Sequence, residues 1–290
     1  MRTIDALRRE RSDRELSGLD ALEIPIPSTP PAVRRLWDGL WPQLAAIGLV
    51  LVLWQVAVAL ELRPVWVLPG PLDVLPRLVE EAGDDLPAAI ATTMRRAVVG
   101  YALALVIGMA IGLAIVRWRR LRTAVASLIT GLQTMPSIAW FPFAILLFGL
   151  SEGAIMFVIV LGAAPSVANG LIHGVDHIPR ILLRAGRVLG ARRLDWYRSI
   201  ILPAALPSFV GGMKQAWAFA WRSLMAGELL VIIAQQPSLG VQLQLQRELA
   251  DAEGLLATMI VVLVIGIVVD QLVFGVIERR IRSRRGLAES

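Results

Sequence analysis

The sequence predicts an all-α polytopic membrane protein with six transmembrane helices. Hydrophobic residues make up 56% of the 290 residues, charged residues make up 18%, and the mean hydropathy is +0.66. A soluble domain carries roughly 45–50% apolar and about 25% charged residues. Six apolar stretches approach or exceed the roughly 20 residues that cross a bilayer as a helix. They are residues 41–60, 97–116, 123–150, 153–172, 209–234 and 255–277.

Basic residues set the expected orientation of these spans, because segments that stay in the cytoplasm carry an excess of Lys and Arg. With a cytoplasmic N-terminus, the inside segments hold 22 basic residues and the outside segments hold 5. This asymmetry accounts for the net charge of +6, so no nucleic acid partner is expected. The expected organisation is a cytoplasmic N-terminal tail (1–40), a first transmembrane helix (41–60), an extracytoplasmic loop (61–96), a core domain of five spans (97–277) and a cytoplasmic C-terminal tail (278–290).

The third span, residues 123–150, is predicted to break near its centre. Pro136 and Pro142 lie within it. A proline removes a backbone donor and crowds the preceding turn, so we expect one span with a broken or kinked middle.

Small residues recur at four-residue spacing in the second and fourth spans. The pairs are Gly108 with Gly112 and Gly170 with Gly174. This spacing lets neighbouring helices approach closely, so we expect these glycines to serve helix packing.

No enzymatic or metal site is expected. The chain has no cysteine, and its single lysine, Lys214, follows Met213 rather than the glycine of a phosphate-binding loop. Residues 149–153 match the spacing of a hydrolase nucleophile elbow, but they form a tight turn between two spans and not a strand–turn–helix unit. The two histidines, His173 and His177, lie about 30 Å away at the far end of the fourth span, where we interpret them as a polar cap.

Residues 173–208 form the longest predicted connection on the inside and indicate a docking surface. Two short helices are expected, at 180–189 and at about 193–201, with Gly190 at the turn and the second helix ending at Leu202-Pro203. Because Gly190 aims the second helix, a bulky residue there is expected to misdirect it.

This loop resembles the EAA loop of binding-protein-dependent ABC import permeases. The family pattern is Glu-Ala-Ala, three residues, Gly, nine residues, Ile, one residue, Leu-Pro. The spacing from Arg184 through Gly190 to Pro203 agrees with it throughout. Two positions depart from the pattern, because Arg184 stands where glutamate is usual and Gly186 where the second alanine is usual. Arg184 cannot make an acidic contact to an ATPase.

Further motifs extend the resemblance over about residues 60–280, to the nitrate/sulfonate/taurine-type branch of these permeases. An extra first span ahead of a five-helix core also agrees with that branch. The motifs are Arg96-x3-Gly100, Leu132–Pro142 with Phe148-Gly149, Leu202–Pro207 and Ala226–Leu229.

The resemblance implies a type I ABC importer (MetI-like) five-helix core plus an extra N-terminal helix, in the inner or plasma membrane with both termini cytoplasmic. The chain would be a non-catalytic subunit that binds no cofactor itself. Its implied partners are a second copy of the same permease, two ABC ATPase subunits that bind ATP and Mg²⁺, an extracytoplasmic substrate-binding protein and the lipid membrane. The residues implied in coupling to the ATPases are Arg184, Ala185, Gly186, Gly190, Arg192, Arg193, Asp195, Trp196, Tyr197, Leu202 and Pro203. Trp196 and Tyr197 also fit an aromatic belt at the membrane interface.

Charged residues inside the spans are costly and therefore indicate a role. From the inner side, Lys214 lies about 8 Å deep and Asp270 about 10 Å deep, so we expect a structural ion pair between them. Arg222 lies about 20 Å deep without an acid at its level, which suits a path for an anion. The alternative is a hydrogen bond from Arg222 to carbonyls at the kink near Pro136. The residues predicted to line the translocation pathway are Met135, Pro136, Trp140, Trp217, Trp221, Arg222 and Glu228.

The expected function is ATP-driven import of a small solute by alternating access. An electropositive path favours an anion such as nitrate, a sulfonate, taurine or bicarbonate. Two alternatives stay open: import of a thiamine-precursor pyrimidine, which the same branch also carries, and a proton-coupled secondary transporter that uses Asp270 or Glu228. The second alternative predicts inverted repeats, and the two halves of the sequence do not resemble each other.

Overall fold

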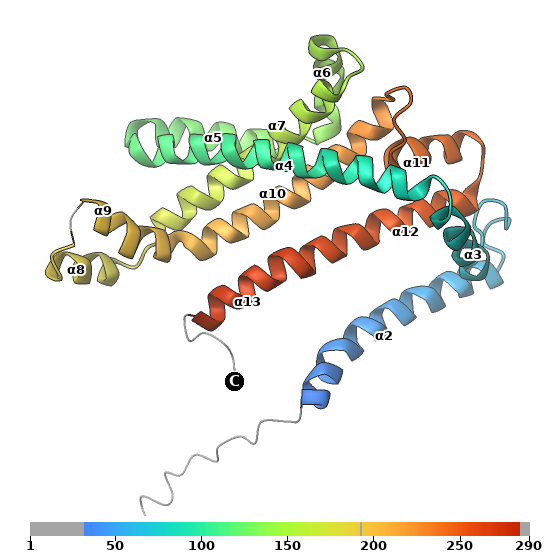
Figure 1. The fold of residues 1–290 in the computed structure, drawn as a ribbon, viewed down its shortest axis with the longest axis horizontal. Coiled ribbons are helices and arrows are strands. Elements are labelled where there is room, and N and C mark those ends of the chain that lie inside the picture. The colour runs from blue at the N-terminus through green and yellow to red at the C-terminus, as the bar shows by residue number, and fades with distance from the viewer. Residues whose placement is uncertain (1–31, 192, 285–290) are drawn as a thin grey trace, which may run out of the picture. The chain divides into compact units, whose positions relative to one another are not determined.

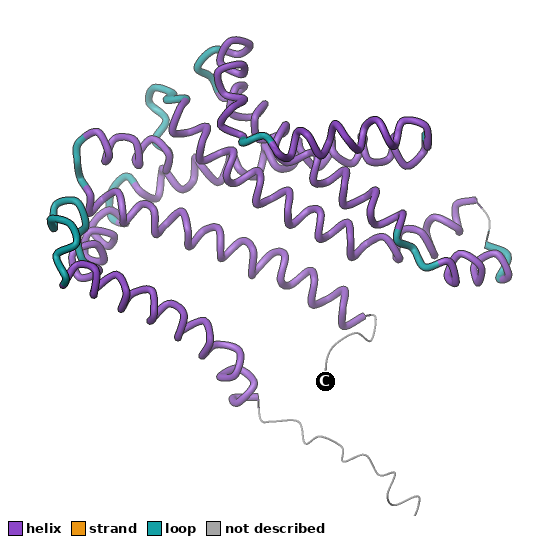
Figure 2. Tube along the Cα trace, turned by 180° about the vertical axis from the view of Figure 1, so that it is seen from behind, coloured by secondary structure: helices purple, strands orange, loops and turns teal. Residues whose placement is uncertain are grey.

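The structure, a computed structural model, describes residues 32–191 and 193–284, and every regular element within these ranges is a helix (Figures 1 and 2). Residues 1–31 and 285–290, which belong to the two predicted tails, lie outside the described residues. The chain divides into two units, residues 1–56 and 57–290. Helix α2 (Ala32–Ala59) makes up the described part of the first unit and continues to the start of the second.

Four of the described helices are long and apolar enough to cross a membrane, and a bent pair gives a possible fifth span. The four cover residues 41–59, 86–117, 152–176 and 252–281. The all-helical fold class is therefore confirmed. The predicted fifth span lies in α10 (Leu202–Leu230) and is not among these helices, so the count of six spans stays a prediction.

Three helices, α4 (Leu86–Arg117), α7 (Glu152–Asp176) and α10, form the centre of the second unit. Glycines allow their close contact. A Cβ on Gly108 would lie 2.5 Å from the carbonyl oxygen of Ala164, and one on Gly170 would lie 2.7 Å from the Cα of Gly212. The packing role predicted for the spaced glycines is confirmed, because a larger residue would force these helices apart.

The predicted break in the third span is confirmed. Helix α5 (Arg119–Thr134) and the segment formed by η1 (Ser137–Trp140) and α6 (Phe141–Phe148) meet at 98°. Met135 and Pro136 between them are extended, because a residue before proline is disfavoured in the helical region. Pro142 does not interrupt α6, since it lies in the first turn, where its missing N–H needs no partner.

Polar side chains hold the break against its neighbours. Gln133 donates to Ser166 of α7 at 2.9 Å and accepts from Asn169 at the same distance. Ser223 of α10 donates to Ser137 at 2.8 Å. The break is thus fixed by hydrogen bonds to two of the three central helices, α7 and α10.

The shorter helices of the second unit that are not yet described lie at the two ends of this bundle (Figure 1). At one end lie α3 (Pro71–Ala82), α11 (Leu239–Glu248) and the beginning of α12 (Ala252–Val269). We call it the clamp end. Helix α4 begins there at Leu86, before the predicted boundary at 97, because Pro87 fits its first turn.

At the opposite end, which we call the loop end, lie α8 (Arg180–Val188), α9 (Arg193–Trp196) and α13 (Gly275–Arg284). Helix α12 runs into α13 through the π-helical turn η3 (Asp270–Phe274). Likewise α9 runs into α10 through the π-helical turn η2 (Tyr197–Ile201). The predicted helix end at Leu202-Pro203 is therefore wrong, since Pro203 lies in the first turn of α10 and the wider π turn before it keeps the chain helical.

Candidate functional site

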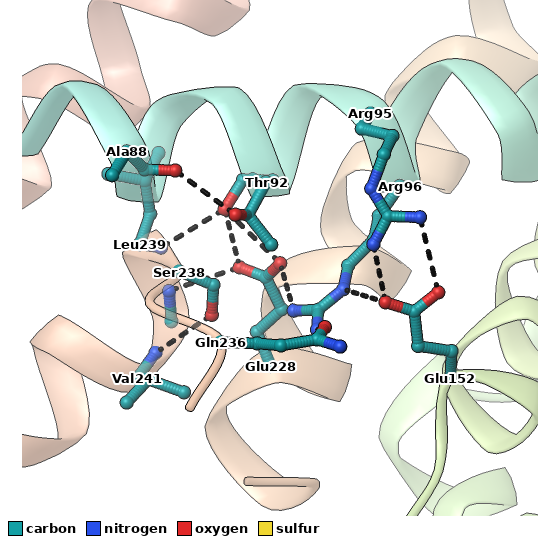
Figure 3. Close-up of polar contacts among 12 residues, drawn as sticks. Ala88, Thr92, Arg95, Arg96, Glu152, Glu228, Gln236, Ser238, Leu239 and Val241 are labelled. Atoms are coloured by element: carbon teal, nitrogen blue, oxygen red, sulfur yellow. Dashed lines mark hydrogen bonds and ion pairs between the residues drawn. The ribbon is translucent and has the colours of Figure 1, made fainter. Parts of the chain in front are cut away.

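A buried polar cluster ties the clamp-end termini of the three central helices together (Figure 3). Its centre is an ion pair between Arg96 of α4 and Glu228 of α10, with Nη1 2.9 Å from Oε1 and side chains that are 1% and 0% exposed. The Arg96 guanidinium also donates to Gln236 at 2.7 Å and to Glu152 of α7 at 3.4 Å. With Thr93, these residues form what we call the clamp.

The carboxylate of Glu228 is fully supplied with donors. Thr93 donates to it from 2.9 Å, and the backbone N–H of Gly240 donates from 3.1 Å. The backbone N–H of Leu239 in turn donates to the Thr93 hydroxyl at 3.0 Å. Gly240 has no larger substitute here, because a Cβ would overlap the Cβ of Glu228. A buried charge satisfied in this way is a structural element.

The sequence predicts Glu228 for the translocation pathway, and the structure instead buries it in the clamp. The partner that reasoning from the sequence missed is Arg96. Its signal was the Arg96-x3-Gly100 motif, since Gly100, one turn later, packs so closely on Ile159 that a Cβ would lie 2.9 Å from it. The motif therefore joins a buried charge to a tight contact between α4 and α7.

Arg222, further along α10 from the clamp, has the opposite environment. Its side chain is exposed, its Nε donates to the carbonyl of Ala218 at 3.1 Å, and its Cζ lies 4.7 Å from the ring centroid of Phe219. Both contacts are within its own helix, so the alternative of a bond to carbonyls near Pro136 is not what the structure contains. Among the described residues, no acid forms an ion pair with Arg222, and its two terminal nitrogens are available to a ligand.

Arg222 lines two cavities, one on each side of α10. A cavity of about 360 Å³ lies against the break, where Thr134, Met135, Pro136 and Ser137 also line it. A cavity of about 660 Å³ separates α10 from α12 and contains Trp217 and Trp221, whose rings stack at 6.1 Å. Of the predicted pathway residues, these cavities bring together Met135, Pro136, Trp217, Trp221 and Arg222, whereas Trp140 lines neither.

The predicted pair of Lys214 and Asp270 is formed. Lys214 Nζ on α10 lies 3.1 Å from Asp270 Oδ2 at the start of η3, and each side chain is 37% exposed. The estimated depths of Lys214 and Asp270 in the membrane were sufficient to predict this ion pair from the sequence.

The loop between α7 and α10 presents an apolar tip. Val188 and Leu189 at the end of α8 are 88% and 85% exposed. Helix α8 packs on the chain that follows through Gly186, where a Cβ would overlap Ile200 and lie 3.2 Å from the Trp196 ring. This tip was not predicted, although an apolar pair directly before a turn glycine is a visible signal.

The predicted coupling residues surround this tip. Gly186 is buried, Trp196 is half-buried, and Arg192 lies outside the described residues, as does the side chain of Arg193. The other seven are exposed: Arg184, Ala185, Gly190, Asp195, Tyr197, Leu202 and Pro203.

Gly190 makes the turn by its backbone conformation. Its φ is +74°, and the N–H of Ala191 bonds to the carbonyl of Gly186 at 3.0 Å, which closes the end of α8. Nothing lies within 4 Å of a Cβ added at Gly190. A Cβ therefore meets no steric conflict, and for a small residue the requirement for glycine comes from the positive φ.

A known protein family matches most of the second unit of this chain. Residues 104–283, more than half of the chain, match the model of the binding-protein-dependent transport system inner membrane component. The chain belongs to this family. It is thus the permease subunit of an ABC importer and a multi-pass membrane protein.

Relatives of this permease agree with the branch predicted from the motifs. It is 30% identical over 207 residues to a protein named probable ABC transporter permease from Brucella melitensis, covering 71% of this chain and 83% of that protein. It is 31% identical over 196 residues to the nitrate import permease protein NrtB of Leptolyngbya laminosa, at 65% and 70% coverage. It is 26% identical over 249 residues to the taurine transport system permease protein TauC of Escherichia coli, at 84% and 89% coverage.

Among solved structures, this permease is similar in fold to a chain of the MetNI methionine ABC transporter in an inward-facing conformation. The TM-score is 0.56 at 20% identity, and the match covers 68% of this chain and 95% of that chain. The MetI-like core predicted from the sequence is confirmed by this likeness, which concerns the fold alone.

Proposed function

We propose that this permease imports a small anion into the cytoplasm, energised by ATP that a separate ATPase hydrolyses. Two copies of the permease, two ABC ATPase subunits and an extracytoplasmic binding protein form the transporter, with both termini of the permease in the cytoplasm. The ATPases bind ATP and Mg²⁺, and the permease itself carries out no chemistry. ATP binding favours one of two membrane states of the permease pair, so the path opens alternately to each side.

Arg222 is the observation that supports an anionic solute. An arginine among membrane-spanning helices is expensive unless it faces water, a partner or a ligand. Arg222 is exposed, borders the cavity at the break and, within the described residues, has side-chain contacts to its own helix. Its planar guanidinium keeps unused donors in a geometry that matches a planar or tetrahedral oxyanion.

The acids of the membrane-spanning helices argue against a proton-coupled carrier. A proton relay needs a carboxylate that can bind and release a proton on the path. Glu228 is held in the clamp by Arg96, and Asp270 is paired with Lys214. Both candidate acids are therefore occupied by structural ion pairs.

The exposed tip of the loop supports coupling to an ATPase. Val188 and Leu189 expose apolar side chains beside the basic residues Arg184 and Arg187. An apolar anchor with a polar rim is the usual anatomy of a protein interface. We propose that this tip enters a groove of the ATPase and transmits its movement to α7 and α10.

A second solute class is favoured by one observation. The stacked rings of Trp217 and Trp221 line the 660 Å³ cavity beside Arg222. Aromatic faces of this kind bind planar rings, so a thiamine-precursor pyrimidine is the second candidate.

Uptake by the reconstituted transporter tests the proposal. The permease, its ATPase and its binding protein are placed in proteoliposomes loaded with ATP, and the uptake of labelled nitrate, ethanesulfonate, taurine, bicarbonate and a hydroxymethylpyrimidine is measured. We expect ATP-dependent uptake of at least one of the anions. ATP-dependent uptake of the pyrimidine alone would select the second candidate, and uptake driven by a proton gradient without ATP would overturn both.

A further inference from the structure

An apolar cavity lies at the loop end, where the predicted coupling residues Leu202 and Pro203 form part of its wall. It measures about 770 Å³ and lies between α4, α7, α10 and α13. Its walls are apolar side chains, among them Leu113, Leu206 and Phe209, and Arg280 of α13 also lines it. Of the described residues that line the cavity, Arg280 alone is charged.

The Arg280 guanidinium has no ion-pair partner in the described part of the chain, and the one side-chain hydrogen bond to this residue goes from Ser283 to its backbone carbonyl. Its side chain is exposed, and no described acid forms an ion pair with it. Glu278, the acid nearest to it in sequence, does not line the cavity. An apolar cavity with one unpaired cation requires an occupant that is apolar over most of its length and anionic at one point.

The level of Arg280 in the membrane can be estimated along its own helix. The continuous helix from Ala252 to Arg280 rises about 42 Å, and a bilayer with its headgroups is about 40–45 Å thick. A helix that begins at one headgroup layer thus brings Arg280 to the opposite one. The exposed Trp118 at the end of α4, with 57% of its side chain accessible, agrees with an interface at this end.

We propose that this cavity binds an anionic phospholipid. The phosphate of its headgroup pairs with Arg280, and the upper part of an acyl chain lies against Leu206 and Phe209 between α10 and α13. Charge complementarity selects an anionic lipid over a zwitterionic one, and basic pockets between transmembrane helices bind such headgroups. The site adjoins α10 where the loop enters it, so the lipid holds α13 against the helix that transmits movement.

Native mass spectrometry of the assembled transporter tests this proposal. The complex is taken from nanodiscs that contain equal amounts of phosphatidylglycerol and phosphatidylcholine, and the retained lipids are counted. We expect the wild type to retain phosphatidylglycerol in several-fold excess over phosphatidylcholine. Arg280→Ala is expected to abolish this excess, and Leu206→Trp is expected to reduce retention of both lipids by filling the cavity.

Arg279→Ala is the matched control, because Arg279 is the adjacent exposed arginine of α13 and does not line the cavity. It is expected to keep the wild-type excess. Equal loss in both arginine variants would overturn the site in favour of general attraction to the basic helix. A wild type without preference would overturn it too. Failure of Leu206→Trp to assemble, with no lipid excess in the wild type, would assign the cavity to a protein segment instead.

Discussion

Arg96 and Arg222 are the same residue type in the same helical bundle, yet the structure uses them in opposite ways. Arg96 is 1% exposed and donates to three side chains, of which Glu228 is itself fully buried. Arg222 is exposed, and among the described residues its side chain makes one hydrogen bond, to the carbonyl of Ala218 on its own helix. The hydrogen-bond donors of Arg96 are satisfied within the protein, whereas the terminal nitrogens of Arg222 are available to another molecule.

These two arginines show how structural charges can be separated from functional ones in a membrane protein. Both residues are costly to place among spans, so rarity does not distinguish them. What distinguishes them is whether other groups of the fold satisfy the charge. By this criterion the clamp is a structural element of the permease, and the two cavities that Arg222 lines are where a solute can bind.

Removing one partner of the clamp is expected to give the largest effect on stability. Glu228→Leu removes the buried counter-ion of Arg96 and leaves only the longer contact to Glu152, and breaking a buried ion pair costs about 3–5 kcal/mol. The measurement is the free energy of unfolding in mixed micelles. The double variant Arg96→Leu with Glu228→Leu serves as the control, and we expect it to be less destabilised than the sum of the single changes. Strict additivity would show that the two charges do not interact.

Lys214 resembles Arg96 in having an acidic partner, Asp270, and resembles Arg222 in being partly exposed. Breaking this ion pair should therefore have an intermediate effect on stability. Lys214→Met leaves a lone carboxylate within the bundle. A charged side chain at the centre of a span costs about 2.5–3.5 kcal/mol. Since both side chains of this pair are 37% exposed, the loss of stability in Lys214→Met should stay below that value. Lys214→Met with Asp270→Leu should restore membrane insertion and thermal stability to near the wild-type level. A double variant as unstable as the single one would contradict a purely structural pair.

Replacing Gly186 or Gly190 in the coupling loop is expected to have the smallest effects on stability. Gly186→Leu forces α8 away from Ile200 and Trp196, an overpacking that costs about 1–3 kcal/mol. Gly190→Ala meets no neighbour and costs the strain of a positive φ, about 1–2 kcal/mol.

Solute-stimulated ATP hydrolysis of the assembled complex separates the two glycine variants. We expect Gly186→Leu to lose most of it, because the tip is displaced, and Gly190→Ala to keep most of it. The reverse order would show that the turn, and not the packing of α8, controls coupling.

Much of the fold follows from local features of the sequence. Pro136 fixes the break, because its effect on Met135 does not depend on the rest of the molecule. The pair of Lys214 and Asp270 follows from depth alone, since each residue's height along its helix is set by the helical rise. The spaced glycines of α4 and α7 likewise predict close contacts.

The clamp could not be predicted in this way. Arg96 and Glu228 are far apart in the chain, and Arg96 lies directly before the predicted second span (97–116), where a charge is ordinary. Their burial depends on how the segment from Gln236 to Gly240 folds back, which no periodic pattern encodes. The helix that continues through Pro203 was missed for a related reason, because a π turn has no signature in composition.

If Arg222 contacts an anionic solute, its replacement should lower the uptake that is measured per assembled complex. Arg222→Leu and Arg222→Lys are reconstituted with the ATPase and the binding protein, and assembly is measured on the same samples. Losing a hydrogen bond to a charged group costs about 1.5–3 kcal/mol, so Arg222→Leu should reduce anion uptake about tenfold or more while assembly is unchanged. Arg222→Lys should retain part of the activity, since it keeps the charge and loses only the planar fork. Unaltered uptake by Arg222→Leu, or uptake that falls only in step with assembly, would show that Arg222 does not contact the solute.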